Sequence, residues 1–434
     1  MDYEGVVRKI LDNAGTDVGD YIEVEREGDS FKGIVMPHVE FSGKDILILK
    51  LDNGYNIGLK LDETCRIQLL KAKGEVTREE ADYVIDPDKP TISILGTGGT
   101  IASYVEYRTG AVFPAEKAKD LVFTVPELAD ICNIKAKIVY SIFSENMTAE
   151  HWRTLATEIA AELDSGARGV VIPHGTDTLG YTAAALSFML DDLSGPVILV
   201  GSQRSSDRPS SDAFLNLTSA ARLANDDLGE VVVVMHGETS DSFASIHRGT
   251  KVRKMHSSRR DAFLSINQSP LGSISPEGET EWLEDHRSRG SGPVKLQTKL
   301  EENVVLVHFY PGMTPSLFRS IINGARGVVI AGTGLGHVSS SLFPEIESLT
   351  RAGIPVVMTS QCLFGRVNMN VYSAGRDLLL KGVIPGEDML PETTFIKLMW
   401  VLGQTSDMNE VTKLMKSNLR GEINPALKLE EYSE

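Results

Sequence analysis

Residues 169–180 read Gly-Val-Val-Ile-Pro-His-Gly-Thr-Asp-Thr-Leu-Gly, a short apolar run followed at once by a polar loop. An apolar stretch with a helical period, residues 181–190, comes next. A continuous apolar run of this kind is typical of a strand that helices cover on both faces. The stretch therefore predicts a strand–loop–helix unit with polar side chains at the carboxyl end of the strand.

The same unit recurs along the chain. Further short apolar runs, each followed by a glycine or polar loop, begin at residues 92, 197, 231, 304, 327 and 355. This repetition predicts an α/β fold with an open, doubly wound sheet, which binds ligands beyond the carboxyl ends of its strands. A stretch rich in Gly, Ser, Pro and charge, residues 286–293, divides the region. We expect a large domain at 91–290 and a smaller C-terminal α/β domain at 300–434.

The first 72 residues have a different pattern. Apolar and polar residues alternate at 21–25, 31–35, 45–51 and 55–61, and glycine-containing turns separate these stretches. Such short alternating strands predict a small N-terminal β-barrel over residues 1–72. Residues 73–90 are charged and poor in large apolar side chains, so we expect them to form a linker.

Composition is that of a soluble globular protein, with 41% hydrophobic and 24% charged residues among 434. A net charge of −17 argues against broad coating of a phosphate backbone by this chain, although a partner could hold RNA. The three cysteines, Cys65, Cys132 and Cys362, lie far apart and predict neither a disulfide framework nor a structural zinc site. With no apolar run of about 18 residues and no leader-like start, we expect a cytoplasmic protein without membrane contact.

Two loops carry hydroxyl side chains at predicted strand ends. Residues 96–103, Gly-Thr-Gly-Gly-Thr-Ile-Ala-Ser, present Thr97 and Thr100, and Ile101 breaks the dinucleotide-binding fingerprint. The loop at 173–180 places Thr176 beside Asp177. Helix capping would explain either loop alone, but two threonine loops in one doubly wound sheet indicate paired hydroxyls around a small polar substrate.

A threonine hydroxyl needs an adjacent base before it can act as a nucleophile. His174 has no evident carboxylate to orient it, so we expect a structural role for it. The other candidates are Lys251 and Lys254, in the cation-rich segment 248–260. Burial and cationic neighbours lower the pKa of a lysine and let it serve as a base. The segment could instead be a solvated or nucleic-acid-facing patch, and spacing does not choose between the two lysines.

These motifs resemble the bacterial-type L-asparaginase/glutaminase family over about residues 90–410. The matching segments are Thr97-Gly-Gly-Thr-Ile-Ala, Tyr107-Arg-Thr-Gly, Ser144-Glu-Asn-Met, His174-Gly-Thr-Asp-Thr and Val252-Arg-Lys-Met. The resemblance implies a two-domain asparaginase/glutaminase-like core. It also implies a homodimer with active sites near the contact between one protomer's large domain and its neighbour's small one.

The resemblance also implies a role for each matched residue. Thr100 is then the first nucleophile, and Tyr107 is the lid residue that positions or activates it. Thr176, Asp177 and Lys254 form a second group that activates the attacking hydroxyl or water, and Asp177 also holds the substrate's α-ammonium.

The implied substrate-binding positions are Ser144, Glu145, Gly99 and Gly175. Ser144 contacts the α-carboxylate, and Glu145 stands where the family carries glutamine. The two glycines belong to loops whose backbone N–H groups can stabilise the tetrahedral oxyanion. Attack on a side-chain amide would give an acyl-enzyme ester and release ammonia.

The N-terminal barrel is not part of ordinary asparaginases. Together with segments 204–212, 251–260 and 361–372, it makes the chain similar to the D subunits of the archaeal Glu-tRNA(Gln) amidotransferases. That resemblance implies release of ammonia from glutamine or asparagine for a tRNA-binding partner, the E subunit. The E subunit would bind Glu-tRNA(Gln), use ATP and Mg, and form Gln-tRNA(Gln). This chain would need no cofactor of its own, and no P-loop is visible in it.

Two other functions fit parts of the pattern. A free-standing cytosolic asparaginase with an appended barrel would share the chemistry and lack the partner. A non-catalytic module could keep the substrate-binding loops as an amino-acid sensor, although the presence of every family nucleophile and base weakens that hypothesis.

Overall fold

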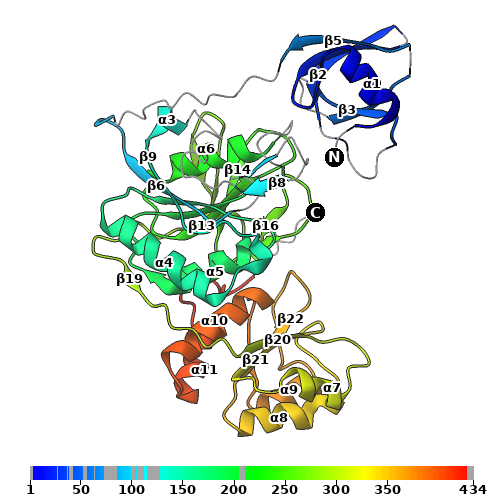
Figure 1. Ribbon diagram of the computed structural model, residues 1–434. Helices are drawn as coiled ribbons and strands as arrows, with labels where there is room; N and C mark the ends of the chain where they lie inside the picture. The colour runs from blue at the N-terminus through cyan, green and yellow to red at the C-terminus, as the bar shows by residue number, and fades with distance from the viewer. Residues whose placement is uncertain are drawn as a thin grey trace.

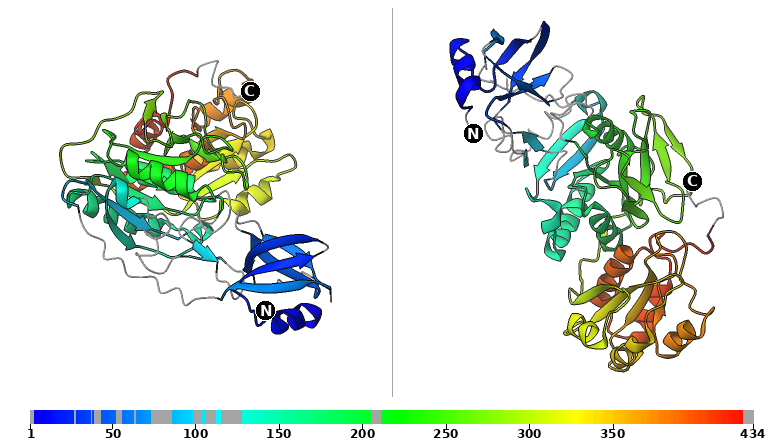
Figure 2. Two further views of the ribbon diagram at one scale, coloured as in Figure 1. Left: turned by 90° about the horizontal axis from the view of Figure 1, so that it is seen from above. Right: turned by 90° about the vertical axis from the view of Figure 1, so that its right-hand side faces the viewer.

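The computed structural model describes residues 3–26, 28–36, 38, 43–51, 56–62, 64–72, 86–98, 103–105, 112–114, 128–204 and 211–427. Figure 1 shows three parts in chain order: a small N-terminal β-domain, a large α/β part and a smaller C-terminal α/β part. Figure 2 shows the same three parts from two further sides. The predicted two-domain α/β core with a preceding small β-domain is confirmed.

The N-terminal part is an antiparallel five-stranded sheet of order β4-β3-β2-β1-β5 with one helix, α1 (Gly5–Asn13). Alternate side chains of β1, Ile22 and Val24, enter its core, because successive residues of a strand point to opposite faces. The sequence pattern predicts four of these strands, but α1 and β5 are absent from that prediction. Its strands are β1 (Tyr21–Arg26), β2 (Asp29–Val35), β3 (Ile46–Leu51), β4 (Asn56–Lys60) and β5 (Arg66–Lys71).

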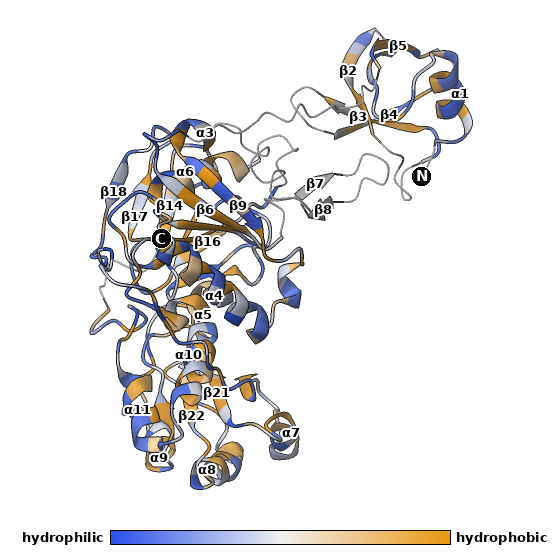
Figure 3. Ribbon diagram, turned by 60° about the vertical axis from the view of Figure 1, so that its left-hand side comes forward, coloured by the Kyte–Doolittle hydropathy of each residue, from blue (hydrophilic) through white to orange (hydrophobic). Residues whose placement is uncertain are grey.

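The large part is built on an eight-stranded sheet of order β18-β17-β14-β13-β12-β10-β6-β9. Its parallel strands are β6 (Thr91–Gly96), β9 (Asn133–Ile138), β10 (Val170–Pro173), β12 (Val197–Val200) and β13 (Val231–His236). All except β9 are predicted apolar runs. Helices α4 (Ala149–Asp164) and α5 (Leu179–Met189) cover one face. Helices α3 (Leu128–Ile131) and α6 (Ala213–Leu223) cover the other. Figure 3 shows the hydrophobic colouring of β6, which lies beside the edge strand β9.

Three antiparallel strands extend the sheet beyond β13, which the parallel-strand prediction did not include. These are β14 (Ala244–Arg248), β17 (Gly272–Ile274) and β18 (Thr280–Trp282). Short ladders join β15 (Val252–Lys254) to β16 (Phe263–Ser265), β11 (Leu190–Asp191) to β19 (Lys295–Leu296) and β7 (Ser103–Val105) to β8 (Val112–Pro114). A 3-10 turn, η2 (Ser144–Asn146), follows β9.

The C-terminal part has a four-stranded parallel sheet of order β20-β21-β22-β23. Its strands are β20 (Val304–His308), β21 (Gly327–Gly332), β22 (Val356–Ser360) and β23 (Ile384–Pro385). Its helices are α7 (Pro315–Ile321), η3 (Ser340–Leu342), α8 (Phe343–Arg351), α9 (Ser373–Leu380), α10 (Pro391–Gln404) and α11 (Met408–Lys416).

Helix α10 joins the two α/β parts. It packs on β20 and β21 and also on α5 of the large part, and Figure 1 shows it between the two sheets. The rings of Phe188 on α5 and Trp400 on α10 stack with centroids 6.0 Å apart. Because one apolar core includes residues of both sheets, the two parts bury their facing surfaces together. No helix among the described residues is both long and apolar enough to cross a membrane.

Candidate active site

The polar loop after β10 lies where the sequence predicts, at the carboxyl end of a central strand. All four residues of β10 are buried between the two helical layers, and α5 begins at Leu179, directly after the loop. Thr176 is half-buried, whereas the Asp177 side chain is 72% exposed. A helix N-terminus carries partial positive charge, so the carboxylate beside it is electrostatically favoured there.

Lys254 completes this loop with two hydrogen bonds. Its Nζ atom lies 2.9 Å from Thr176 Oγ1 and 2.8 Å from Asp177 Oδ1. The three residues come from β10–α5 and from β15, 77 or 78 positions apart in the chain. An amine within hydrogen-bond reach of both a hydroxyl and a carboxylate has the geometry of a nucleophile, its base and an orienting group. The structure therefore brings together the predicted Thr–Asp–Lys group.

The β15–β16 hairpin holds Lys254 above the loop. Its ladder pairs Lys254 with Phe263, and the Met255 N–H donates to the Ala262 carbonyl at 2.6 Å. Strand β15 also lies close to α5, since a Cβ added at Gly180 would be 3.2 Å from the Val252 carbonyl oxygen. Glycine at this point of α5 thus permits the close approach that brings Lys254 within reach of Thr176.

Lys251, the other candidate base, lies elsewhere. Its Nζ atom is 2.5 Å from Asp388 Oδ2, and the two side chains are 1% and 0% exposed. Burial lowers the pKa of Lys251, and the neighbouring Asp388 carboxylate opposes that shift. The second carboxylate oxygen of Asp388 accepts the Asn424 N–H at 3.0 Å. Lys251 is therefore a buried ion-pair partner that ties the large part to the C-terminal part.

Ser144 forms one wall beside the loop. It is buried in η2, and its carbonyl accepts a 2.7 Å hydrogen bond from the Thr178 hydroxyl. A Cβ at Gly175 would be 2.7 Å from Ser144 Cβ and 2.8 Å from its Oγ, so only glycine leaves this segment in place. Glu145, the next residue, is exposed. Ser144, Glu145 and Gly175 thus adjoin the Thr–Asp–Lys group.

The first threonine loop is tied to the second by Thr97. The Thr97 hydroxyl donates to the Pro173 carbonyl at 2.9 Å, and the side chain is 2% exposed. Of the two hydroxyls that this loop presents at the strand end, Thr97 therefore has a structural role. Gly98 has φ +99°, and a Cβ there would be 2.4 Å from the Ile142 carbonyl oxygen. The expected nucleophile Thr100, together with Gly99 and Tyr107, lies outside the described residues.

His174 is structural, as the sequence predicts. Its Nδ1 lies 2.7 Å from the Gly175 carbonyl oxygen, and its Nε2 lies 3.0 Å from Thr182 Oγ1. Since a carbonyl only accepts, Nδ1 carries the proton and Nε2 accepts from the hydroxyl. The hydroxyl in turn accepts from Trp152 Nε1 at 3.0 Å. Complete burial lowers the pKa of His174 to about 4, so the ring is neutral at pH 7.

The sequence pattern did not identify the residues that give Thr176 its space and its support. A Cβ at Gly201, after β12, would be 2.8 Å from Thr176 Cγ2. The Gly201 carbonyl accepts from Asn216 Nδ2 at 2.9 Å, and Asn216 Oδ1 lies 2.7 Å from His236 Nδ1. A glycine directly after a buried apolar run is the one signal that could have pointed to this contact. Within the described ranges, no group of three or more His, Cys, Asp or Glu residues could hold a metal ion.

Three family matches cover most of the chain. Residues 91–287 match the family described as Asparaginase, N-terminal, and residues 303–415 match the Glutaminase/Asparaginase C-terminal domain. Residues 16–70 match the GatD N-terminal domain. Among solved structures, the thermostable L-asparaginase from Thermococcus kodakarensis has a TM-score of 0.70 at 34% identity, over 77% of this chain and 100% of its own. L-asparaginase I from Vibrio cholerae has a TM-score of 0.69 at 30% identity, over 77% and 99%.

Curated relatives match the chain nearly from end to end. The D subunit of the glutamyl-tRNA(Gln) amidotransferase from Pyrococcus furiosus is 54% identical over 431 residues, which cover 97% of this chain and 98% of that protein. The D subunit from Methanothermobacter thermautotrophicus is 48% identical over 428 residues, which cover 98% of each chain. With an asparaginase-like core behind a GatD N-terminal domain, the chain belongs to the family of glutamyl-tRNA(Gln) amidotransferase D subunits.

Proposed function

We propose that the chain hydrolyses the side-chain amide of glutamine or asparagine and supplies the ammonia that converts Glu-tRNA(Gln) to Gln-tRNA(Gln). The observation that carries this proposal is the Thr176–Asp177–Lys254 group, with Nζ 2.9 and 2.8 Å from the hydroxyl and the carboxylate. That group lies in a chain whose curated relatives are named for the amidotransferase.

The proposed reaction proceeds through an acyl-threonine. Thr100 attacks the amide carbonyl, its proton passes to the leaving nitrogen, and the tetrahedral intermediate then releases ammonia and leaves the acyl-enzyme ester. Water then attacks the ester, releases glutamate or aspartate and restores the hydroxyl. Lys254 acts as the base for this hydroxyl or water through Thr176, while Asp177 orients the amine.

The remaining predicted residues have roles around the substrate. Asp177 binds the α-ammonium, Ser144 contacts the α-carboxylate, and Glu145 lies beside Ser144 at the substrate-binding loop. Tyr107 positions the nucleophile. Backbone N–H groups of the loops at Gly99 and Gly175 stabilise the tetrahedral oxyanion, an effect of roughly 3–4 kcal/mol per donor in well-studied enzymes.

Ammonia release alone does not amidate a tRNA, so the proposal includes partners. The E subunit binds Glu-tRNA(Gln) and activates its glutamate with ATP and Mg, and the present chain acts as a homodimer beside it. The chain itself needs no cofactor for amide hydrolysis. Its three cysteines all lie among the described residues and none of them forms a disulfide, which suits the reducing cytoplasm.

The second candidate is a free-standing L-asparaginase. The complete Thermococcus kodakarensis asparaginase aligns with 77% of this chain, and this favours the same hydrolytic chemistry without a partner. The GatD N-terminal match at residues 16–70 favours the amidotransferase.

Ammonia release from glutamine and asparagine separates the two candidates. The assay compares the purified chain alone with the chain plus the E subunit and Glu-tRNA(Gln), using Thr100→Ala and Lys254→Met as controls. Turnover that rises only with both partners supports the proposal, and full turnover without them supports the asparaginase. Turnover unaffected by Thr100→Ala would contradict the nucleophile assignment in either case.

A further inference from the structure

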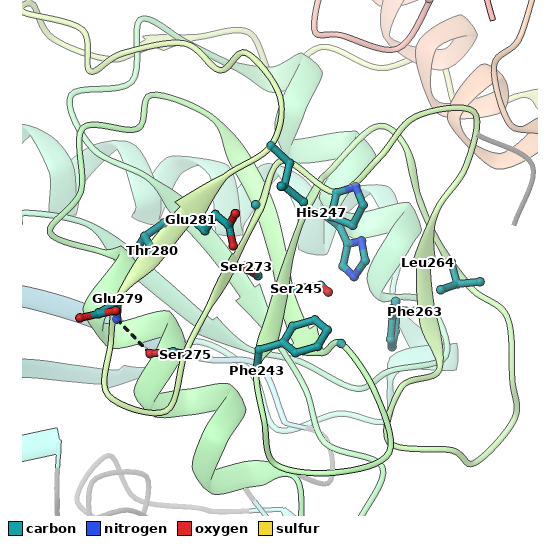
Figure 4. A pocket seen from close by; sticks show the side chains of 14 residues that line it. Phe243, Ser245, His247, Phe263, Leu264, Ser273, Ser275, Glu279, Thr280 and Glu281 are labelled. Atoms are coloured by element: carbon teal, nitrogen blue, oxygen red, sulfur yellow. Dashed lines mark hydrogen bonds between the residues drawn. The ribbon is translucent and has the colours of Figure 1, made fainter. Parts of the chain in front are cut away.

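A cavity of about 850 Å³ lies at the antiparallel end of the large sheet, and Thr176, Asp177 and Lys254 are not among its lining residues. Strands β14, β17 and β18 form its floor, and β16 forms a wall (Figure 4). Its volume is within the range of small-molecule sites, roughly 300–1,000 Å³. Its lining includes Phe243, Ser245, His247, Phe263, Ser273 and Glu281.

The floor of this cavity is polar because of strand register. Ser245 pairs with Ser273, which pairs with Glu281, so the three side chains share one face of the sheet. The opposite face, with Ile246 and Ile274, belongs to the apolar core. Strand β14 thus packs one face against the apolar core. Its other face presents hydrogen-bonding side chains to the cavity beneath the β15–β16 hairpin.

His247 is the unusual member of this floor. Its side chain is 1% exposed, and its Nδ1 lies 2.9 Å from Ser265 Oγ. Its side chain lines the cavity, and its buried Nε2 has no hydrogen-bond partner among the described residues. Burial lowers the pKa of His247 to about 4, so the ring is neutral at pH 7. A buried, unpaired ring nitrogen is costly, which is a reason to expect a ligand that pairs with it.

The lining is acidic, which favours a positively charged ligand. Glu279 and Glu281 are acidic, and the described lining residues include neither lysine nor arginine. Phe243 and Phe263 supply aromatic surface, and Figure 4 shows both rings on the same side of the His247 ring. Carboxylates and aromatic faces both attract cations, and a neutral imidazole accepts an N–H.

We propose that this cavity binds a small organic cation with an ammonium head and an aromatic or apolar body. The ammonium donates to Glu281 and to the unpaired Nε2 of His247, whose Nδ1–H then donates to Ser265. The serine hydroxyls of the floor accept further N–H groups, while the body packs against Phe243 and Phe263. None of the cavity's residues belongs to the catalytic group, and Phe263 pairs with Lys254 in the β15–β16 ladder.

Calorimetric titration of the full chain with three small aromatic compounds of similar shape tests the proposal. The probes are benzylamine, benzyl alcohol and benzoate, which differ in the charge of the head group. We expect saturable 1:1 binding of benzylamine, and at least about tenfold weaker binding of the other two because they lose the charge-assisted hydrogen bonds. Glu281→Gln should weaken benzylamine by a similar factor.

Matched variants locate the binding. Glu277→Gln removes the same charge from the neighbouring β17–β18 turn, outside the lining, and it should leave the affinity unchanged. Asp177→Asn removes the acid of the catalytic group and should also leave it unchanged. Equal affinity for benzyl alcohol, absence of saturable benzylamine binding, or binding lost with Asp177→Asn and retained with Glu281→Gln would each overturn the proposal.

Discussion

Replacing each of two lysines three residues apart should have opposite consequences. Lys251→Met removes one partner of an ion pair whose side chains are 1% and 0% exposed, and it leaves the Asp388 carboxylate buried with the Asn424 N–H. Breaking a buried pair in this way costs about 3–5 kcal/mol, because a charge stays in a medium of low polarity without its partner. That is a large fraction of the roughly 5–15 kcal/mol that stabilises a typical domain.

Lys254→Met is the matched control. Its carboxylate partner, Asp177, is 72% exposed, so water replaces the lost contact and the pair contributes about 0–1 kcal/mol. We therefore expect Lys254→Met to keep the stability of the parent chain and to lose amide hydrolysis, since the hydroxyl loses its base. Lys251→Met should lose stability, and its folded fraction should retain hydrolysis.

Urea denaturation followed by circular dichroism gives the free energy of unfolding, and ammonia release gives the activity. A third variant, Lys251→Met/Asp388→Leu, should recover more than about half of the lost stability, because an apolar pair fills the buried site without an unpaired charge. Equal stability loss in the two single variants, or full hydrolysis by Lys254→Met, would refute the assignment of the two lysines.

Three further predictions concern the loop around His174. Gly175→Ala should lower kcat/KM by displacing Ser144, which lies 2.7 Å from the added Cβ, and wild-type kinetics in that variant would contradict the contact. Thr182→Val should lower the free energy of unfolding by about 1–3 kcal/mol, since it leaves Trp152 Nε1 and His174 Nε2 unpaired, whereas Thr182→Ser should retain most of it. Burial lowers the pKa of His174 from 6.5 to about 4, so the unfolded chain binds the proton first. The free energy of unfolding should then fall as the pH is lowered from 6.5 to 4, by up to about 3 kcal/mol. In urea titrations, His174→Gln should show a shallower dependence of this free energy on pH.

Periodicity along the sequence was enough to predict the layers of the fold. Continuous apolar runs mark the parallel strands β6, β10, β12 and β13, because helices cover both of their faces. Alternation marks four strands of the N-terminal sheet. Strand β5 leaves no clear alternation because most of its residues are exposed. Helix α1 does have a helical spacing of apolar residues, with Val7 and Leu11 buried four positions apart, and the prediction did not include it.

Local spacing likewise determined part of the site. Thr176 and Asp177 are neighbours at the end of a buried strand, so any fold that keeps this strand presents them together. Local spacing did not distinguish Thr97, which has a structural role, from Thr100 in the same loop. The donation of Thr97 to the Pro173 carbonyl, 76 residues away, is a contact that only the parallel pairing of β6 with β10 creates.

The choice between the lysines belongs to the tertiary structure alone. Lys251 lies in the turn before β15 and Lys254 ends that strand, so local spacing does not decide which of the two faces the loop. Lys251 pairs with Asp388, 137 residues away, and Lys254 contacts Thr176, 78 residues away. These distant partners decide which lysine faces the loop. The sequence by itself thus determined the strands, the loops and the residue types of the site. The partners of each side chain depended on packing between distant segments, which no local spacing encodes.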